Sequence, residues 1–99
     1  MRRGEIWRYA AKGPRGDRLV VLVSGSGINS DDRRAWLLGV EVTSDDPGDL
    51  LAVPLPGGRW ADASTLVRVF RRWLTEPAEM LDDDVIERID VALRAALDL

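Results

Sequence analysis

The feature that most constrains the fold is the continuously apolar run at residues 19–23, LVVLV. A short uninterrupted run of valine and leucine is typical of a strand that is buried on both faces. Glycine, serine and asparagine follow it at residues 24–30, where we expect a turn. The run therefore predicts the core strand of a β-sheet, with Arg18 at its start.

Further strands are expected at residues 5–9, 35–44 and 50–55, each bounded by turn-forming residues. Gly39 is a candidate bulge or close backbone approach, and Pro54 indicates an edge or a strand end. Apolar side chains and arginines are interleaved at residues 64–74. This pattern is compatible with either a strand or a helix.

The C-terminal segment has the spacing of an amphipathic helix, which we expect at about residues 83–96. Three aspartates precede it, and such residues cap free N–H groups and favour the positive end of the helix dipole. Capping explains the triplet better than a magnesium site, since consecutive side chains at a helix start point in different directions. The periodic residues are Val85, Ile86, Ile89, Leu93, Ala96 and Leu97.

With 99 residues the chain has the size of one domain, which we expect to span 1–99. Several short strands followed by one helix predict a mainly β fold, a small bent sheet or barrel with the helix packed on one side. No segment approaches the roughly 18 apolar residues that cross a bilayer, and no secretory signal opens the chain, so a cytoplasmic location is expected.

The chain contains no cysteine and no histidine. This excludes disulfides, thiolate zinc sites, thiol nucleophiles and the commonest general base. Carboxylates, hydroxyls and guanidinium groups remain for any chemistry.

Charge is unevenly distributed along the chain, although the formal net charge is only -3. Residues 1–34 carry eight basic against four acidic side chains, a net of +4, whereas residues 74–99 carry two against eight, a net of -6. The basic front half is suited to a polyanionic partner.

Several stretches match, in order and spacing, the motifs of one known family. The opening MRRGEIWRY places a basic residue and a glycine before an acidic residue and an aromatic strand. GDRLVVLVS at 16–24 resembles a Gly-x-Arg-Pro-hydrophobic strand, and VTS at 42–44 a hydrophobic-Thr-Ser strand end. Leu-Thr at 74–75 and the acidic helix at 81–99 resemble the closing segment. Together these stretches resemble the MazF/PemK family of toxin endoribonucleases from bacterial toxin–antitoxin pairs.

The resemblance implies an SH3-like, PemK-type β-barrel of five to seven strands and an endoribonuclease that cuts single-stranded RNA without a metal or cofactor. Arg18 would take the place of the catalytic arginine and Thr43 that of the catalytic threonine, with Ser44 beside it at the substrate. The implied products are a 2′,3′-cyclic phosphate and a 5′-hydroxyl. A homodimer is also implied, together with a cognate antitoxin whose extended acidic tail occupies the RNA site.

The chain departs from the family's pattern at two places near these residues. Leu19 stands where the family has a proline, and residues 10–17 (AAKGPRGD) lack its Gly-Ser-Glu. The alternative is therefore a homologue without catalysis that acts as a protein- or RNA-binding module, including a gyrase-inhibitor-like toxin of the same fold.

Three more residues are candidate substrate contacts. Lys12 and Arg15 lie in a glycine- and proline-rich segment and could clamp RNA phosphates, or belong to an ordinary solvated loop. Asn29 follows the core strand and is either a contact or a turn former.

The tryptophans could stack on bases, but burial in the core or in a dimer interface is the favoured interpretation. Trp60 lies beside glycines and is the best candidate for an exposed ring. The others are Trp7, Trp36 and Trp73.

Overall fold

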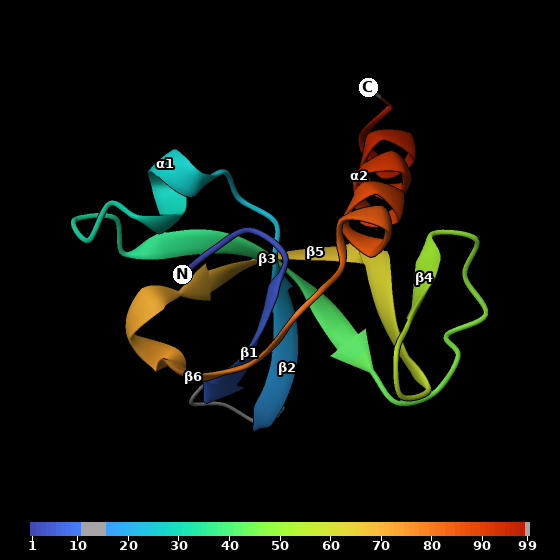
Figure 1. The fold of residues 1–99 in the computed structure, drawn as a ribbon, viewed down its shortest axis with the longest axis horizontal. Helices are drawn as coiled ribbons and strands as arrows, with labels where there is room; N and C mark the ends of the chain where they lie inside the picture. The colour runs from blue at the N-terminus through green and yellow to red at the C-terminus, as the bar shows by residue number, and fades with distance from the viewer. Residues whose placement is uncertain (11–15, 99) are drawn as a thin grey trace.

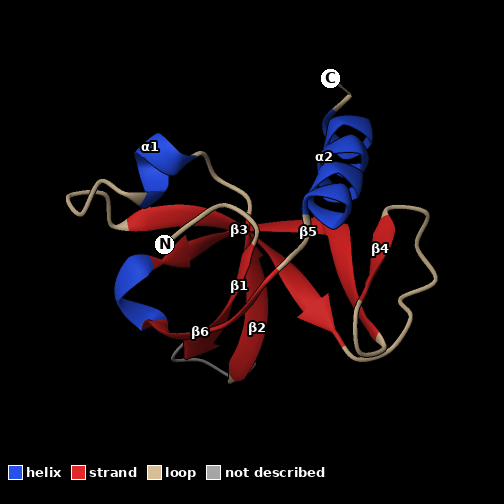
Figure 2. Cartoon of the chain, in the orientation of Figure 1, coloured by secondary structure: helices blue, strands red, loops and turns tan. Residues whose placement is uncertain are grey.

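The computed structural model describes residues 1–10 and 16–98. They form one six-stranded sheet in the order β4-β5-β3-β2-β1-β6, antiparallel at every pairing. Helix α2 packs against β4 and β5, and the short helix α1 lies beside the start of β3 (Figures 1 and 2). The elements are β1 (Glu5–Ala10), β2 (Asp17–Leu22), α1 (Ser26–Asn29), β3 (Trp36–Thr43), β4 (Ala52–Leu55), β5 (Arg59–Phe70), the 3-10 turn η1 (Arg71–Trp73), β6 (Leu74–Met80) and α2 (Asp83–Leu97).

Strand β2 is buried on both faces, as its apolar run predicts. Val20 and Leu22 belong to one hydrophobic cluster, which includes Tyr9. Val21, between them, belongs to a second cluster with Ile6. Because successive side chains of a strand point to opposite faces, this one strand contributes to two cores.

Helix α2 covers the second cluster with the buried residues Val85, Ile89 and Ala92, and its predicted position is confirmed. The capping prediction is wrong in its detail. Asp82 is the N-cap residue, but its side chain makes no cap hydrogen bond. The aspartates of the first turn therefore favour the helix through its dipole. Within the described residues no helix is long and apolar enough to span a membrane.

The expected barrel is an open, bent sheet among the described residues, with β4 and β6 as its two edges (Figure 2). Pro54 lies in β4, which confirms the edge prediction, and Pro77 lies in β6. Proline cannot donate to a ladder, so an edge is where it is tolerated.

The ambiguous segment at 64–74 is mainly a strand. Strand β5 begins earlier than expected, at Arg59, and ends at Phe70, where η1 turns the chain into β6. Strand β6 was not predicted, because its sequence LTEPAEM is mostly polar and lacks an apolar alternation.

Gly39 is a close backbone approach, as predicted. A Cβ added there would lie 3.3 Å from Val69 Cγ1 and 3.4 Å from the carbonyl oxygen of Val21. A side chain at this position would require the neighbouring atoms of β2 and β5 to shift by a few tenths of an ångström, so glycine fits the close approach without strain.

Arg71 organises the segment that joins α1 to β3. Its Nη1 donates to the carbonyl of Asn29 at 2.9 Å and its Nε to that of Arg34 at 2.8 Å. Nη2 donates to the carbonyls of Ile28 and Asp31 at 3.0 and 2.9 Å. A single guanidinium thereby binds four backbone oxygens, of α1 and of the turn that follows it.

We predict that Arg71→Met lowers the free energy of unfolding by about 2–4 kcal/mol, because hydrogen bonds to charged donors are lost together. Denaturant unfolding followed by circular dichroism measures this. The neighbouring Arg72→Met is the matched control and should cost less than about 1 kcal/mol, since Arg72 is exposed and only stacks on Phe70. Equal losses in the two variants would contradict the role given to Arg71.

Candidate functional site

The start of β2 and the end of β3 lie side by side at one end of the sheet. Leu19 pairs with Val42 in the antiparallel ladder, so the same register brings Arg18 opposite Thr43. Both residues line one open cavity of about 600 Å³, together with Ser44. Three of the residues predicted from sequence are therefore brought together.

Arg18 is held by two neighbours. Its Cζ lies 5.2 Å from the centre of the Tyr9 ring, and its Nε lies 3.3 Å from Glu41 Oε1. The Arg18 side chain is 22% exposed and that of Glu41 only 7%. Nε is buried and makes no aligned hydrogen bond within the described part of the chain, so its contact with Glu41 is an ion pair.

The Thr43 hydroxyl donates to the carbonyl oxygen of Asp45 at 2.9 Å. Its lone pairs stay available as acceptors, but donation to a phosphate requires the hydroxyl to rotate away from Asp45. The turn after β3 thus holds the hydroxyl in one orientation.

Arg59 also lines this cavity and was not singled out from the sequence. Its Nη2 forms an ion pair with Glu79 and donates to the carbonyl oxygen of Pro56 at 3.2 Å. It begins β5 directly after two glycines, and this position at a tight turn was the only signal for it in the sequence.

The cavity has mixed charge. Carboxylates of Asp17, Asp45 and Asp46 lie on its wall with the guanidinium groups of Arg18 and Arg59. A polyanion that enters it must therefore bind at the arginines and avoid the acids.

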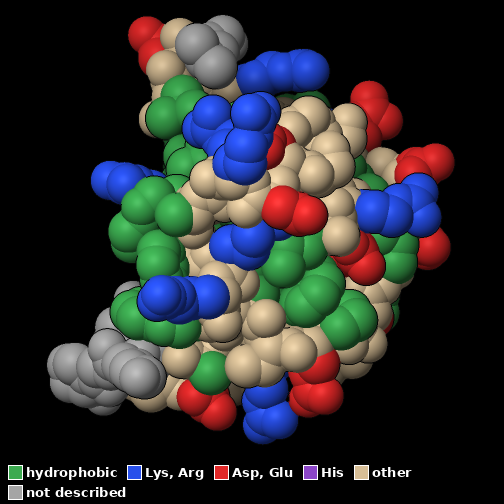
Figure 3. Space-filling model, turned by 90° about the vertical axis from the view of Figure 1, so that its left-hand side faces the viewer, with side chains coloured by type: hydrophobic (Ala, Val, Ile, Leu, Met, Phe, Trp, Pro, Cys, Tyr) green, Lys and Arg blue, Asp and Glu red, His purple; other side chains and the backbone are tan. Residues whose placement is uncertain are grey.

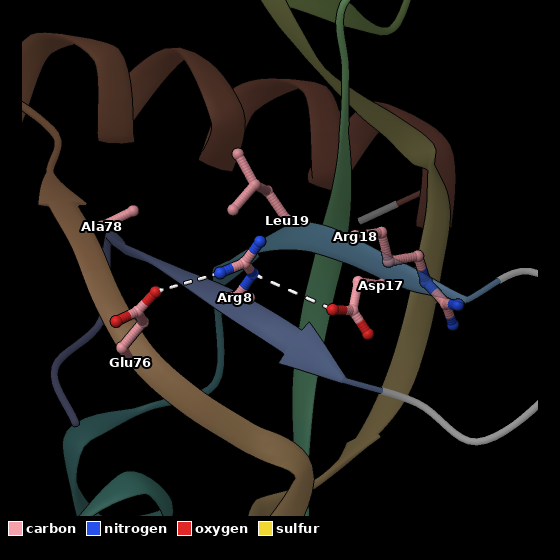
Figure 4. A pocket seen from close by; sticks show the side chains of 6 residues that line it. All are labelled: Arg8, Asp17, Arg18, Leu19, Glu76 and Ala78. Carbon is pink, nitrogen blue, oxygen red and sulfur yellow. Dashed lines mark hydrogen bonds and ion pairs between the residues drawn. The ribbon is translucent and has the colours of Figure 1, made fainter.

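A second cavity of about 310 Å³ adjoins the first and shares Arg18, Asp17 and Leu19 with it. Arg8 lies between two carboxylates there, with Nη1 3.3 Å from Glu76 Oε1 and Nε 4.0 Å from Asp17 Oδ2. Figure 4 shows that the Arg18 guanidinium points away from Arg8 and Glu76. The positive charge of Arg8 is thus compensated by the two carboxylates, whereas Arg18 faces the larger cavity.

Asn29 is not part of either cavity and is not an exposed substrate contact. It is 1% exposed and lies in α1, beside the start of β3, whereas Thr43 ends that strand (Figure 1). Its Oδ1 accepts from Ser24 Oγ at 2.5 Å, and its Nδ2 donates to the Ser24 carbonyl at 2.9 Å. Both polar atoms of the Asn29 side chain bind Ser24 in the turn. The prediction that Asn29 contacts the substrate is therefore corrected, and its role is structural.

Lys12 and Arg15 lie outside the described residues. Among the tryptophans, Trp36 is the exposed one, at 41%, and Trp60 is half-buried, so the expectation that Trp60 is the exposed ring is wrong. Residues 1–10 and 16–98 contain no group of three or more carboxylates placed to hold a metal ion.

We predict that Asn29→Ala lowers the free energy of unfolding by about 1–3 kcal/mol, because the buried Ser24 groups lose their partner. Ligand binding at the larger cavity should not change. Thermal unfolding measures the first effect, and the exposed Ser26→Ala on the same helix should stay within about 0.5 kcal/mol of wild type. A stable Asn29→Ala protein with impaired RNA binding would contradict this structural role and show that Asn29 contacts the substrate.

No model of a protein family matches this chain, and no curated protein matches its sequence. Its structure, however, is similar to solved structures over almost its whole length. An endoribonuclease from a mycobacterial species, solved in complex with its cognate antitoxin, superposes with a TM-score of 0.87 at 18% identity, over 100% of this chain and 96% of that chain. A chain of the MazE-MazF structure from Deinococcus radiodurans gives 0.86 at 17% identity, over 100% and 96%. The Mycobacterium tuberculosis toxin MazF-mt6 gives 0.78 at 13% identity, over 94% and 97%.

At these identities the comparison establishes the fold, which is that of the MazF endoribonucleases. The resemblance noted in the sequence is thereby confirmed for the arrangement of strands and helix.

Proposed function

We propose that this chain is the toxin of a toxin–antitoxin pair and a metal-independent endoribonuclease that cuts single-stranded RNA. The observation that carries the proposal is the convergence of Arg18 and Thr43 on one cavity, within the fold of MazF endoribonucleases. A guanidinium and a hydroxyl at one site are the groups that can stabilise charge on a phosphodiester in the absence of histidine and metal.

In the proposed reaction the ribose 2′-oxygen attacks the adjacent phosphorus, and the bond from phosphorus to the 5′-oxygen breaks. The products are a 2′,3′-cyclic phosphate and a 5′-hydroxyl. Arg18 forks onto the phosphate oxygens as negative charge accumulates, and the hydroxyl of Thr43 donates a further hydrogen bond. Ser44 lies beside them in the cavity and contacts the substrate.

Two protons must move in this reaction, one from the 2′-hydroxyl and one to the leaving 5′-oxygen. Arginine stays protonated at physiological pH and is a poor base. Among the described residues of the cavity, the carboxylates of Asp17, Asp45 and Asp46 are the groups able to accept the first proton. The carboxylic acid formed in this way, or solvent water in the open cavity, gives the second proton to the leaving 5′-oxygen. Lys12 and Arg15 would bind flanking phosphates in this proposal.

The proposed partners are a cognate antitoxin, single-stranded RNA and a second copy of the chain, in the cytoplasm. Two of the similar structures contain an antitoxin or MazE, which supports the first partner. For the homodimer, Trp36 and Leu38 lie on one face of β3 and are 41% and 39% exposed. Figure 3 shows hydrophobic side chains at the surface between basic ones on one side of the molecule.

We predict that the purified protein cuts an unstructured RNA in the presence of EDTA. Arg18→Ala should lower kcat/KM at least about 100-fold, because charge on the phosphorane loses its main partner. Thr43→Val should lower it about 10-fold or more, for the loss of one hydrogen-bond donor. Gel analysis of end-labelled RNA, with the ends identified by mass spectrometry, measures both effects.

Arg88→Ala is the matched control for that experiment, since Arg88 pairs only with Asp84 at 3.2 Å on the exposed side of α2. It should retain wild-type activity and stability. Intact RNA after prolonged incubation with excess wild-type protein would argue decisively against the nuclease.

The alternative is a module of the same fold that binds a protein or RNA without cutting it. The Thr43 hydroxyl, which is engaged with Asp45, and the absence of Gly-Ser-Glu before β2 favour this alternative. It predicts capture of a defined protein, such as a topoisomerase, and growth arrest that Arg18→Ala does not relieve.

We also predict that a peptide with the sequence of the cognate antitoxin's acidic tail binds at the RNA cavity. Its dissociation constant should rise about 10-fold when salt is raised from about 0.05 to 0.5 M, because the charges at the arginines are screened. Arg59→Ala should weaken the binding, since Arg59 lines the cavity. Isothermal titration calorimetry measures both, and affinity that is independent of salt would contradict this placement of the peptide.

A further inference from the structure

Tyr9, Arg18 and Glu41 project from one face of the sheet on three neighbouring strands. Tyr9 pairs with Arg18 between β1 and β2, and Val20 pairs with Glu41 between β2 and β3. Residues opposite each other in an antiparallel pair share a face, as do residues two apart along a strand. Glu41 is therefore the diagonal neighbour of Arg18, within reach of a long side chain.

Glu41 lies where the pairing of β3 with β5 is irregular. Val40 pairs with Leu66 and Val42 with Ala61, so β5 carries additional residues opposite Glu41. Such bulges redirect side chains and are frequent beside functional sites. The Glu41 carboxylate is buried there, and a buried charge needs a charged or hydrogen-bonding partner.

The contacts of Arg18 within the described residues use only part of its guanidinium. Glu41 faces Nε, and the Tyr9 ring covers one face of the plane. The terminal nitrogens Nη1 and Nη2 remain for an incoming group. The Glu41 carboxylate and the Tyr9 ring together fix the position of the Arg18 guanidinium and the tilt of its plane. A phosphate would bind at the two terminal nitrogens.

We propose that Glu41 is a positioning residue for Arg18, with the Tyr9 ring as its second support. Glu41 does not line the cavity and acts on the RNA only through the arginine. Residues 11–16, which join β1 to β2, contain no glutamate, whereas β3 places one against the arginine. The role rests on the proposed nuclease function.

The test is a kinetic comparison of Glu41→Gln with wild type on single-stranded RNA in EDTA. Loss of the charge that anchors Nε should lower kcat about 10- to 100-fold, because misplacement of a catalytic group by about 1 Å has effects of that size. KM should change less than about 3-fold, since the terminal nitrogens still bind phosphate. Asp90→Asn, which removes an ion pair between Arg3 and α2, is the matched control and should retain wild-type kcat.

Two further comparisons separate positioning from a merely structural role. In an Arg18→Lys background, which lacks Nε, Glu41→Gln should lower kcat less than about 3-fold further. Tyr9→Leu should lower kcat more than Tyr9→Phe, because phenylalanine keeps the ring and loses only the hydroxyl that accepts from the Phe70 N–H at 2.9 Å. Thermal unfolding of every variant shows whether the loss of activity follows the loss of stability.

Wild-type kcat in Glu41→Gln, or an equal further loss in the Arg18→Lys background, would overturn the positioning role and leave the nuclease intact. A wild-type protein that binds RNA with 2′-O-methyl groups but never cuts unmodified RNA would overturn the nuclease instead. The positioning role, which is a role in cutting, would then fall together with the nuclease.

Discussion

Burial of β2 on both faces is the constraint on which the remaining structure depends. Val20 and Val21 point into different cores, so a one-residue slip of this strand would exchange its two faces. The register of β1 and β3 against β2 is thereby fixed. Arg18, directly before the apolar run, is consequently placed next to Tyr9 on one side and the end of β3 on the other.

The elements that could be predicted from sequence are those whose own residues carry the signal. The LVVLV run specifies its strand, the apolar spacing of α2 specifies its helix, and Gly39 marks a close approach between backbones. Within the site, Arg18, Thr43 and Ser44 were found through resemblance to a family, because none of these residue types is distinctive by itself at a strand end. In the structure the three residues line one cavity.

The remainder depends on contacts between distant segments, which a single sequence does not encode locally. Strand β6 is polar and contains Pro77, and it lies at the edge of the sheet where it pairs with β1. In the sequence, Asn29 does not differ from other turn residues. Its structural role becomes visible only through its two hydrogen bonds with Ser24. In the sequence, Glu41 is simply the polar residue of a mostly apolar strand. The register of three strands in the structure is what shows that it faces Arg18.

The prolines of the two outermost strands have a consequence for assembly. Pro54 and Pro77 each remove one backbone donor from the two edge strands of the sheet that the described residues form. Growth of the sheet by addition of a foreign strand, the route by which many β proteins polymerise, is disfavoured at both margins. Association of this chain with another polypeptide is thus directed toward side-chain surfaces and away from continuous backbone pairing.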